Sequence, residues 1–118
     1  MVVYNEAVTT HTDGILFHIS DRNVSSSIFP LEHSAPPTIV PSITLQRAID
    51  RIGGDVFVKM DIEGAEYDVL KNIPPQVQEI IGEAHPEKAG RSNDELKSLL
   101  SHFKSVTIEE GKSIFHAV

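Results

Sequence analysis

The stretch "DVFVKMDI", residues 55–62, constrains the fold of this chain more than any other segment. Residues 56–58 are apolar at consecutive positions, so both faces of a strand formed here would be buried, as in a parallel sheet covered by helices. Before it, "SITLQRAIDRIGG" spaces Leu45, Ala48, Ile49 and Ile52 as on one face of a helix and ends in two glycines. A helix followed by a buried strand favours an α/β fold.

The alternation of helix and strand continues along the chain. "AEYDVLKNI" has helical spacing, and "VQEIIGEAHP" is typical of a strand that Pro86 closes. "SNDELKSLLSHF" opens with a capping box, in which Ser92 precedes Glu95 by three positions. The middle of the chain therefore predicts parallel strands joined by right-handed crossovers.

Both ends of the chain have the pattern of β-hairpins. Residues 2–20 contain two stretches of strand-forming residues around an Asp-Gly turn, and "KSVTIEEGKSIFHAV" predicts a second hairpin. Serines and four prolines predict a long loop over residues 21–41. We therefore expect one domain over residues 1–118, with a parallel sheet centre and antiparallel hairpins at both ends.

Composition excludes several classes of function. The net charge of −7 argues against nucleic acid and against an anionic membrane surface as partners. The chain has no cysteine, which rules out disulfides and thiolate metal sites and suits a reducing compartment. "MVVYNEAVTT" lacks the basic start and apolar core of a signal peptide, so we expect a cytoplasmic protein.

Polar side chains follow two of the predicted strands. Ligands of open α/β sheets bind outside the carboxyl ends of the strands. Residues two apart on a strand share a face, so these side chains would converge on one rim. Such a set suits general base chemistry or a divalent cation. The candidates are Lys59, Asp61, Glu63, Glu83 and His85.

Simpler interpretations of the same residues stay open. Asp61, Glu63 and Glu66 could only stabilise the N-terminus of the following helix, and Lys59 could be the ion-pair partner of Asp61. His85, just before a proline, could simply end its strand. A divalent metal held by Asp61, Glu63 and Glu83 is a further alternative, but the sequence gives no complete ligand set, so we assign no metal from it.

The stretch "VFVKMDIEGAEYDVL" resembles the signature of FkbM-type methyltransferases, in which an apolar strand leads into K-x-D-x-E-G-A-E. Four further segments resemble the family in the same order along the chain: "YNEAVTTHTDGILFHIS", "SSSIF", "VPSITLQRAID" and "EIIGEAHP". The chain has Gln46 where the family usually has aspartate, so the role of that position does not carry over.

The resemblance implies part of a class I, Rossmann-like sheet and transfer of a methyl group from S-adenosylmethionine to a hydroxyl of a small molecule or sugar. It places Asn5, Ala7 and Val8 near the adenine of the cofactor, and Asp61 beside the substrate at the end of the fourth strand. Such a reaction mainly requires positioning of the reactants and removal of a hydroxyl proton.

The resemblance assigns that work to the candidates at the two strand ends. Asp61, Glu63, Glu83 and His85 would position the acceptor and take its proton, and Lys59 would orient it. The identity of the acceptor does not follow from a fold-level likeness.

Two family features do not occur in this sequence: the glycine-rich cofactor loop after a first strand and the acidic ribose-binding residue after a second. In the family's sheet those strands lie between the third and fourth. We therefore expect the C-terminal portion of such a domain, from a longer protein or a degenerate relative, with weak cofactor binding. Exposed strand edges favour pairing with a second copy, and the alternative function is a non-catalytic binding or assembly module.

Overall fold

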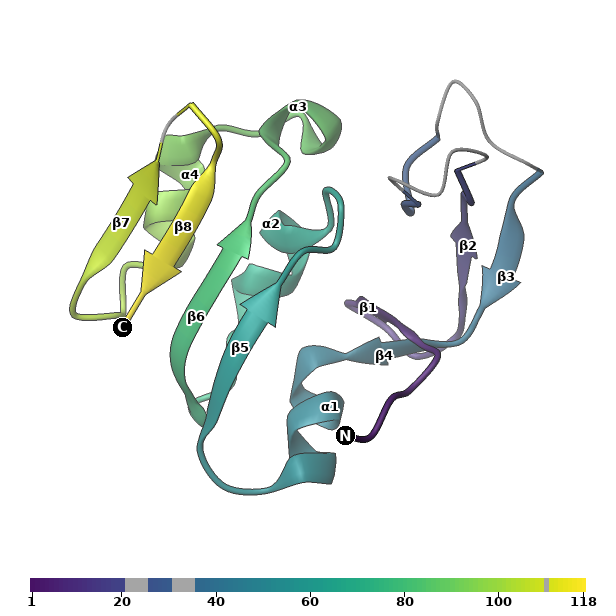
Figure 1. Cartoon of the computed structure of the whole chain (residues 1–118), viewed down its shortest axis with the longest axis horizontal. Coiled ribbons are helices and arrows are strands. Elements are labelled where there is room, and N and C mark those ends of the chain that lie inside the picture. The colour runs from purple at the N-terminus through teal and green to yellow at the C-terminus, as the bar shows by residue number, and fades with distance from the viewer. Residues whose placement is uncertain (21–25, 31–35, 110) are drawn as a thin grey trace.

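A computed structural model describes residues 1–20, 26–30, 36–109 and 111–118, and shows a mixed α/β fold (Figure 1). Residues 21–25 and 31–35 of the loop predicted over residues 21–41, and part of the turn predicted between the last two strands, lie outside the described residues. The described part of that loop contains a short strand, β3 (Thr38–Val40), where no regular structure was expected.

The largest sheet has four strands in the order β5-β6-β8-β7. β5 (Val56–Met60) and β6 (Val77–Glu83) are parallel, as the alternating pattern predicted. β7 (Val106–Glu109) and β8 (Ile114–Ala117) form the predicted C-terminal hairpin. β8 pairs antiparallel with β6, so parallel pairing is confined to one edge of this sheet and the expected parallel centre is not present.

The predicted helices are present, although some are short. α1 (Leu45–Ile52) begins where the Thr44 hydroxyl accepts a hydrogen bond from the Arg47 amide, and α4 (Asn93–Leu99) has the same cap at Ser92. The helix expected after Gly64 is α2 (Glu66–Val69) with a 3₁₀ turn, η1 (Leu70–Asn72), and α3 (Pro86–Ala89) is a single turn. Within the described residues, no helix has both the length and the apolar character needed to cross a membrane.

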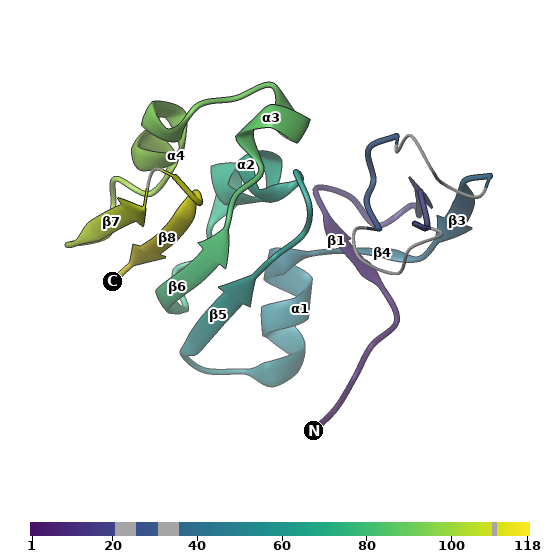
Figure 2. The same cartoon turned by 45° about the horizontal axis from the view of Figure 1, so that its top comes forward.

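The core lies between the helices and one face of the four-stranded sheet (Figure 2). Buried side chains of the helices and of the α4 C-cap pack on buried strand side chains. The main ones are Tyr67, Leu70, Leu96 and the C-cap residue Leu100 on one side, and Met60, Ile80, Phe115 and Ala117 from the strands. The opposite face of the sheet is open, and on it Phe57 is 78% exposed. The predicted burial of both faces is therefore wrong for β5.

The N-terminal hairpin prediction is also wrong. β1 (Ala7–Thr9) pairs in parallel with β4 (Ser42–Thr44), and β2 (Ile15–Phe17) pairs antiparallel with β3. The turn residues are held by a distant segment, because the Gly14 amide donates to the Ser42 hydroxyl, which itself donates to the His11 carbonyl. These contacts tie the turn to β4 rather than joining β1 to β2.

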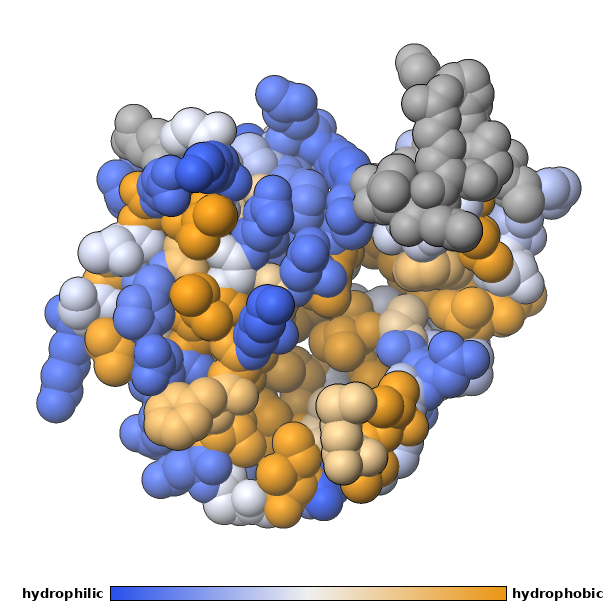
Figure 3. Space-filling view, in the orientation of Figure 1, coloured by the Kyte–Doolittle hydropathy of each residue, from blue (hydrophilic) through white to orange (hydrophobic). Residues whose placement is uncertain are grey.

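A hollow lined by hydrophobic side chains lies between β5 of the four-stranded sheet and the N-terminal strands (Figure 3). Within the described residues β5 pairs only with β6, so its other edge is free. This free edge agrees with the exposed strand edges that the sequence led us to expect.

Candidate functional site

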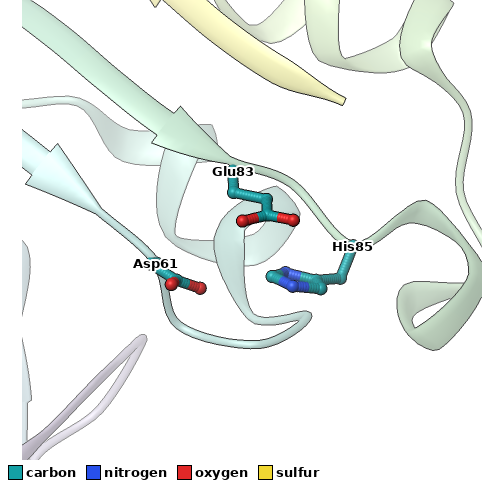
Figure 4. A group of neighbouring side chains, drawn as sticks. All are labelled: Asp61, Glu83 and His85. Carbon is teal, nitrogen blue, oxygen red and sulfur yellow. The ribbon is translucent and has the colours of Figure 1, made fainter. Parts of the chain in front are cut away.

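The register of β5 and β6 brings two carboxylates together. Met60, the last residue of β5, is opposite Gly82. Asp61 directly follows β5, and Glu83 is the last residue of β6. His85 follows two positions later, just before α3. Ligand atoms of Asp61, Glu83 and His85 all lie within 4.8 Å of one another, and Figure 4 shows the three side chains turned toward a common point. The predicted convergence of these three side chains is therefore observed.

Gly82 makes this approach of the strands possible. A Cβ atom at Gly82 would lie 2.5 Å from the Met60 carbonyl oxygen and 2.7 Å from the Phe115 ring. Contacts this close do not occur between real atoms, so any larger residue would push β5, β6 or Phe115 aside. The glycine therefore fixes the spacing of the two strand ends that carry Asp61 and Glu83.

A strained turn follows Asp61. Glu63 has φ of 54° and Gly64 has φ of 114°, both in the left-handed region that side chains disfavour. The Glu63 carbonyl accepts a hydrogen bond of 2.9 Å from the hydroxyl of Ser27, which is almost fully buried. A Cβ on Gly64 would lie 2.7 Å from the Phe29 ring. The turn is thus held by contacts with a segment far upstream.

The carboxylate of Glu66 stabilises the same turn by accepting hydrogen bonds from two of its backbone amides. Glu66 is fully buried, and its two oxygens accept hydrogen bonds from the Ile62 amide at 3.0 Å and the Gly64 amide at 2.9 Å. Glu66 does lie in the first turn of α2, as that alternative supposed, but its carboxylate is buried and bonded to backbone amides of the preceding turn. Buried carboxylates require such donors, because desolvation without partners is costly.

Glu66 also contacts the imidazole of His85. The Nδ1 atom of His85 lies 3.2 Å from Glu66 Oε1, and because an ionised carboxylate only accepts, this contact assigns a hydrogen to Nδ1. On the other side of the ring, Nε2 lies 3.4 Å from Glu63 Oε2, and the carboxylate of Glu63 is itself paired with the Lys88 ammonium. The ring is thereby held between two carboxylates, with its side chain 17% exposed.

The remaining predicted residues lie around this group. Lys59 is exposed on β5 and lines a cleft of about 330 Å³ together with Asp61 and Glu83. It forms no ion pair with Asp61 or with any other part of the chain that the structure describes. Glu63 lies outside the converging group, so the metal-ligand set considered from the sequence is corrected from Asp61, Glu63 and Glu83 to Asp61, Glu83 and His85.

The residues expected near a cofactor lie on the other side of Asp61. Ala7 and Val8 line a cleft of about 210 Å³ whose opposite wall includes Asp61 and Glu63. Asn5 lines a smaller neighbouring cavity of about 100 Å³, together with Ala7. Of the residues that the resemblance implies, Ala7 and Val8 therefore share a cleft with Asp61 and Glu63, whereas Asn5 and Glu83 line other cavities.

Three residues with clear structural roles at the site were not singled out as candidates: Ser27, Glu66 and Lys88. Glu66 lies in the motif itself, and its position after Gly64 was visible, but its burial depends on how the turn folds back. Ser27 belongs to a run of serines that has no local signal beyond that of a loop. The pairing of Lys88 with Glu63 depends on the position of α3.

Comparison with known proteins identifies the family. The chain has the mixed α/β fold and the polar strand ends described above, and residues 3–108 match the methyltransferase FkbM domain. This chain belongs to the FkbM methyltransferase domain family, as the sequence resemblance indicated, and its class is that of methyltransferases. No curated protein and no solved structure matches the chain.

Proposed function

We propose that this chain supplies the acceptor side of an S-adenosylmethionine-dependent methyltransferase that methylates a hydroxyl of a small molecule or sugar. Family membership supports the reaction class. The observation that carries the proposal is the convergence of Asp61, Glu83 and His85 at two adjacent strand ends, beside the cleft that Ala7 and Val8 line.

Methyl transfer to a hydroxyl needs an oxygen placed in line with the methyl group and a group that removes its proton. Asp61 lines both the 210 Å³ cleft and the 330 Å³ cleft, so an acceptor oxygen beside it faces both. The carboxylates of Asp61 and Glu83 and the Nε2 atom of His85 are the groups available to hold or take the proton. Lys59 at the edge of the cleft orients the acceptor.

The residues present fit one part of the cofactor. Ala7 and Val8 give a small apolar wall suited to a flat adenine ring, and Phe17 lines the same cleft. Clefts of about 210 and 100 Å³ are smaller than the pockets of about 300–1,000 Å³ that usually enclose a ligand. When bound, S-adenosylmethionine supplies an electrophilic methyl group, and we expect the chain by itself to bind it weakly.

Calorimetric titration of S-adenosylhomocysteine into the purified chain tests the cofactor role. We expect weak, saturable binding that is lost in Ala7→Leu, because the longer side chain fills the cleft, and kept in Ala48→Leu, a matched change on α1 away from it. Binding that is equal in both variants would contradict the assignment of Ala7. A flat titration at millimolar ligand would not affect the family membership. It would favour the alternative function, a non-catalytic binding or assembly module.

Such a binding role is the second candidate function, and the free edge of β5 favours it. Exposed sheet edges pair readily with another chain, and Phe57 beside this edge is 78% exposed. If the chain forms a homodimer here, sedimentation velocity should show Phe57→Lys as a monomer. Ile52→Lys changes a comparably exposed apolar residue on α1, and should leave the dimer intact.

A further inference from the structure

We propose that Asp61, Glu83 and His85 form a binding site for one divalent cation (Figure 4). Carboxylate oxygens together with an imidazole nitrogen suit first-row transition metals such as Mn²⁺ and Zn²⁺ better than a set of oxygens alone, which suits Mg²⁺ or Ca²⁺. The proposal concerns binding of the metal by this chain and does not depend on the reaction proposed above.

The spacing of the three side chains fits a common metal. Their ligand atoms lie within 4.8 Å of one another. Two atoms bound to one metal at about 2.1 Å each are at most about 4.2 Å apart, so small side-chain rotations complete the set. Asp61 and Glu83 are exposed and can make such rotations without moving the sheet.

The local charge also favours a cation. Among the residues that the structure describes, neither the Asp61 carboxylate nor the Glu83 carboxylate has a hydrogen-bond or ion-pair partner, although the two lie close together. Two like charges at this distance repel one another, and a cation between them removes that repulsion. The nearby Lys88 does not serve this purpose, because its ammonium is paired with Glu63.

A third observation comes from outside the ligand group. Glu66 is fully buried and holds the Nδ1 side of the His85 ring. Nε2, which lies 3.4 Å from Glu63 Oε2, is then the nitrogen that would bind a metal, and the ring would turn from Glu63 toward the ion. Metal-binding histidines commonly donate their other ring N–H to a carboxylate in this way, which fixes the tautomer and the direction of the ring.

Three protein ligands leave coordination positions open, as in catalytic rather than structural metal sites. If the proposed methyltransferase function holds, an open position would take the acceptor hydroxyl oxygen, and acceptors with two neighbouring oxygens would bind best. This last step rests on the proposed function, whereas the cation site does not.

Titration of Mn²⁺ and Zn²⁺ into the chelator-treated chain, followed by calorimetry, tests the site. We expect one equivalent to bind and the affinity to fall at least 10-fold in Asp61→Asn, Glu83→Gln and His85→Asn. Glu66→Gln should lower it about 10–100-fold, the usual effect of removing such a supporting carboxylate. Broadening of backbone NMR signals by Mn²⁺ should centre on residues 61, 83 and 85.

The chain offers a matched control in a second histidine–glutamate pair. His116 Nε2 lies 2.6 Å from Glu79 Oε1, and neither residue belongs to the converging group. His116→Asn and Glu79→Gln should leave the affinity unchanged. Equal losses in these variants, or no binding at millimolar metal, would overturn the proposal.

Further measurements distinguish loss of metal binding from misfolding of a variant and from failure of the cofactor proposal. Because Asp61 and Glu83 are exposed, their variants should keep the native NMR spectrum, so a lost site in them cannot be a lost fold. Titration of S-adenosylhomocysteine into the same samples separates the two proposals. Cofactor binding without metal binding would overturn the cation site alone, and metal binding without cofactor binding would contradict only the proposed function.

Discussion

The carboxylate of Glu66 and the imidazole of His85 are joined across 19 positions of sequence by a contact of 3.2 Å between Oε1 and Nδ1. This contact connects the buried turn after β5 to the end of β6, and it directs the histidine ring toward Asp61 and Glu83. The buried carboxylate therefore supports both the geometry of the turn and the geometry of the site.

Replacement of Glu66 by glutamine should destabilise the fold. The new amide group would place a donor against a backbone N–H that now donates to a carboxylate oxygen, and a buried donor left without a partner costs about 1–3 kcal/mol. Chemical denaturation would measure the loss. Glu79→Gln, at a carboxylate that is 38% exposed, is the matched control and should change stability by less than about 0.5 kcal/mol. Equal effects of the two changes would contradict the structural role of Glu66.

Replacement of Gly64 by alanine should destabilise the turn that carries the site. The φ of 114° alone costs a larger residue about 1–3 kcal/mol, and the added Cβ would also meet the Phe29 ring. Thermal unfolding followed by circular dichroism would show the effect. Gly111→Ala should change stability by less than about 0.5 kcal/mol, because the added Cβ would meet no atom within 4 Å apart from those of the adjacent residues. A neutral Gly64→Ala variant would show that the turn can take another conformation.

Tyr67→Phe should raise the free energy of unfolding by about 1 kcal/mol, because a buried hydroxyl without a partner is costly. Tyr67 is 1% exposed, and its hydroxyl oxygen has no hydrogen bond to any described residue. Tyr4→Phe is the control, since Tyr4 is 59% exposed and should be insensitive. A loss of stability in Tyr67→Phe would reveal a bound water or another partner for the hydroxyl.

The same burial raises the pKa of the Tyr67 hydroxyl above its ordinary value of 10.0, and the charges of Glu66 and Glu95 raise it further. The chain has two tyrosines, so absorbance titration of Tyr4→Phe would follow Tyr67 alone. Because the folded state resists ionisation of this group, stability should fall as the pH rises through the pKa that tyrosine has in the unfolded chain. Ionisation at or below the ordinary value would contradict the burial of the hydroxyl.

Glu6 should titrate below its ordinary pKa of 4.5, because its carboxylate accepts hydrogen bonds from Arg51 at 2.5 and 3.1 Å and is attracted by the guanidinium charge. The stabilisation from a lowered pKa is present above the unfolded value and is lost as the pH falls through the folded one, here on the acid side of 4.5. NMR titration of the Glu6 carboxyl carbon would measure the shift. It should disappear in Arg51→Gln and persist in Arg47→Gln, an exposed arginine of the same helix.

The sequence predicted the ends of β5 and β6 well, because both strands have strong local patterns and a crossover helix makes them parallel. Parallel strands end at the same edge, and this alone brings Asp61 near Glu83 and His85. The N-terminal hairpin failed for the opposite reason. The Asp13-Gly14 turn is a local signal. The pairing of β1 instead depends on β4, whose residue Ser42 pairs with Ala7 although it lies more than thirty positions later in the sequence.

The buried support of the site was harder to predict. Glu66 looks like an exposed acid at the start of a helix until the turn at Glu63 folds its carboxylate inward. The order of β7 and β8 was equally hidden, because a hairpin pattern does not say which of its strands will contact the sheet. Each of these features depends on contacts between distant segments, which local patterns do not contain.

The hydrogen bond from Ser27 to the Glu63 carbonyl spans 36 positions and ties the turn to the N-terminal part of the chain. Such a long-range contact forms only after the loop between its ends has closed, which has an entropic cost. Local opening of the N-terminal segment would release the turn while the four-stranded sheet stays folded. Amide exchange at residues 61–64 would then measure how often the N-terminal segment opens. The rate of exchange in the turn would thus show whether that segment and the four-stranded sheet unfold together or separately.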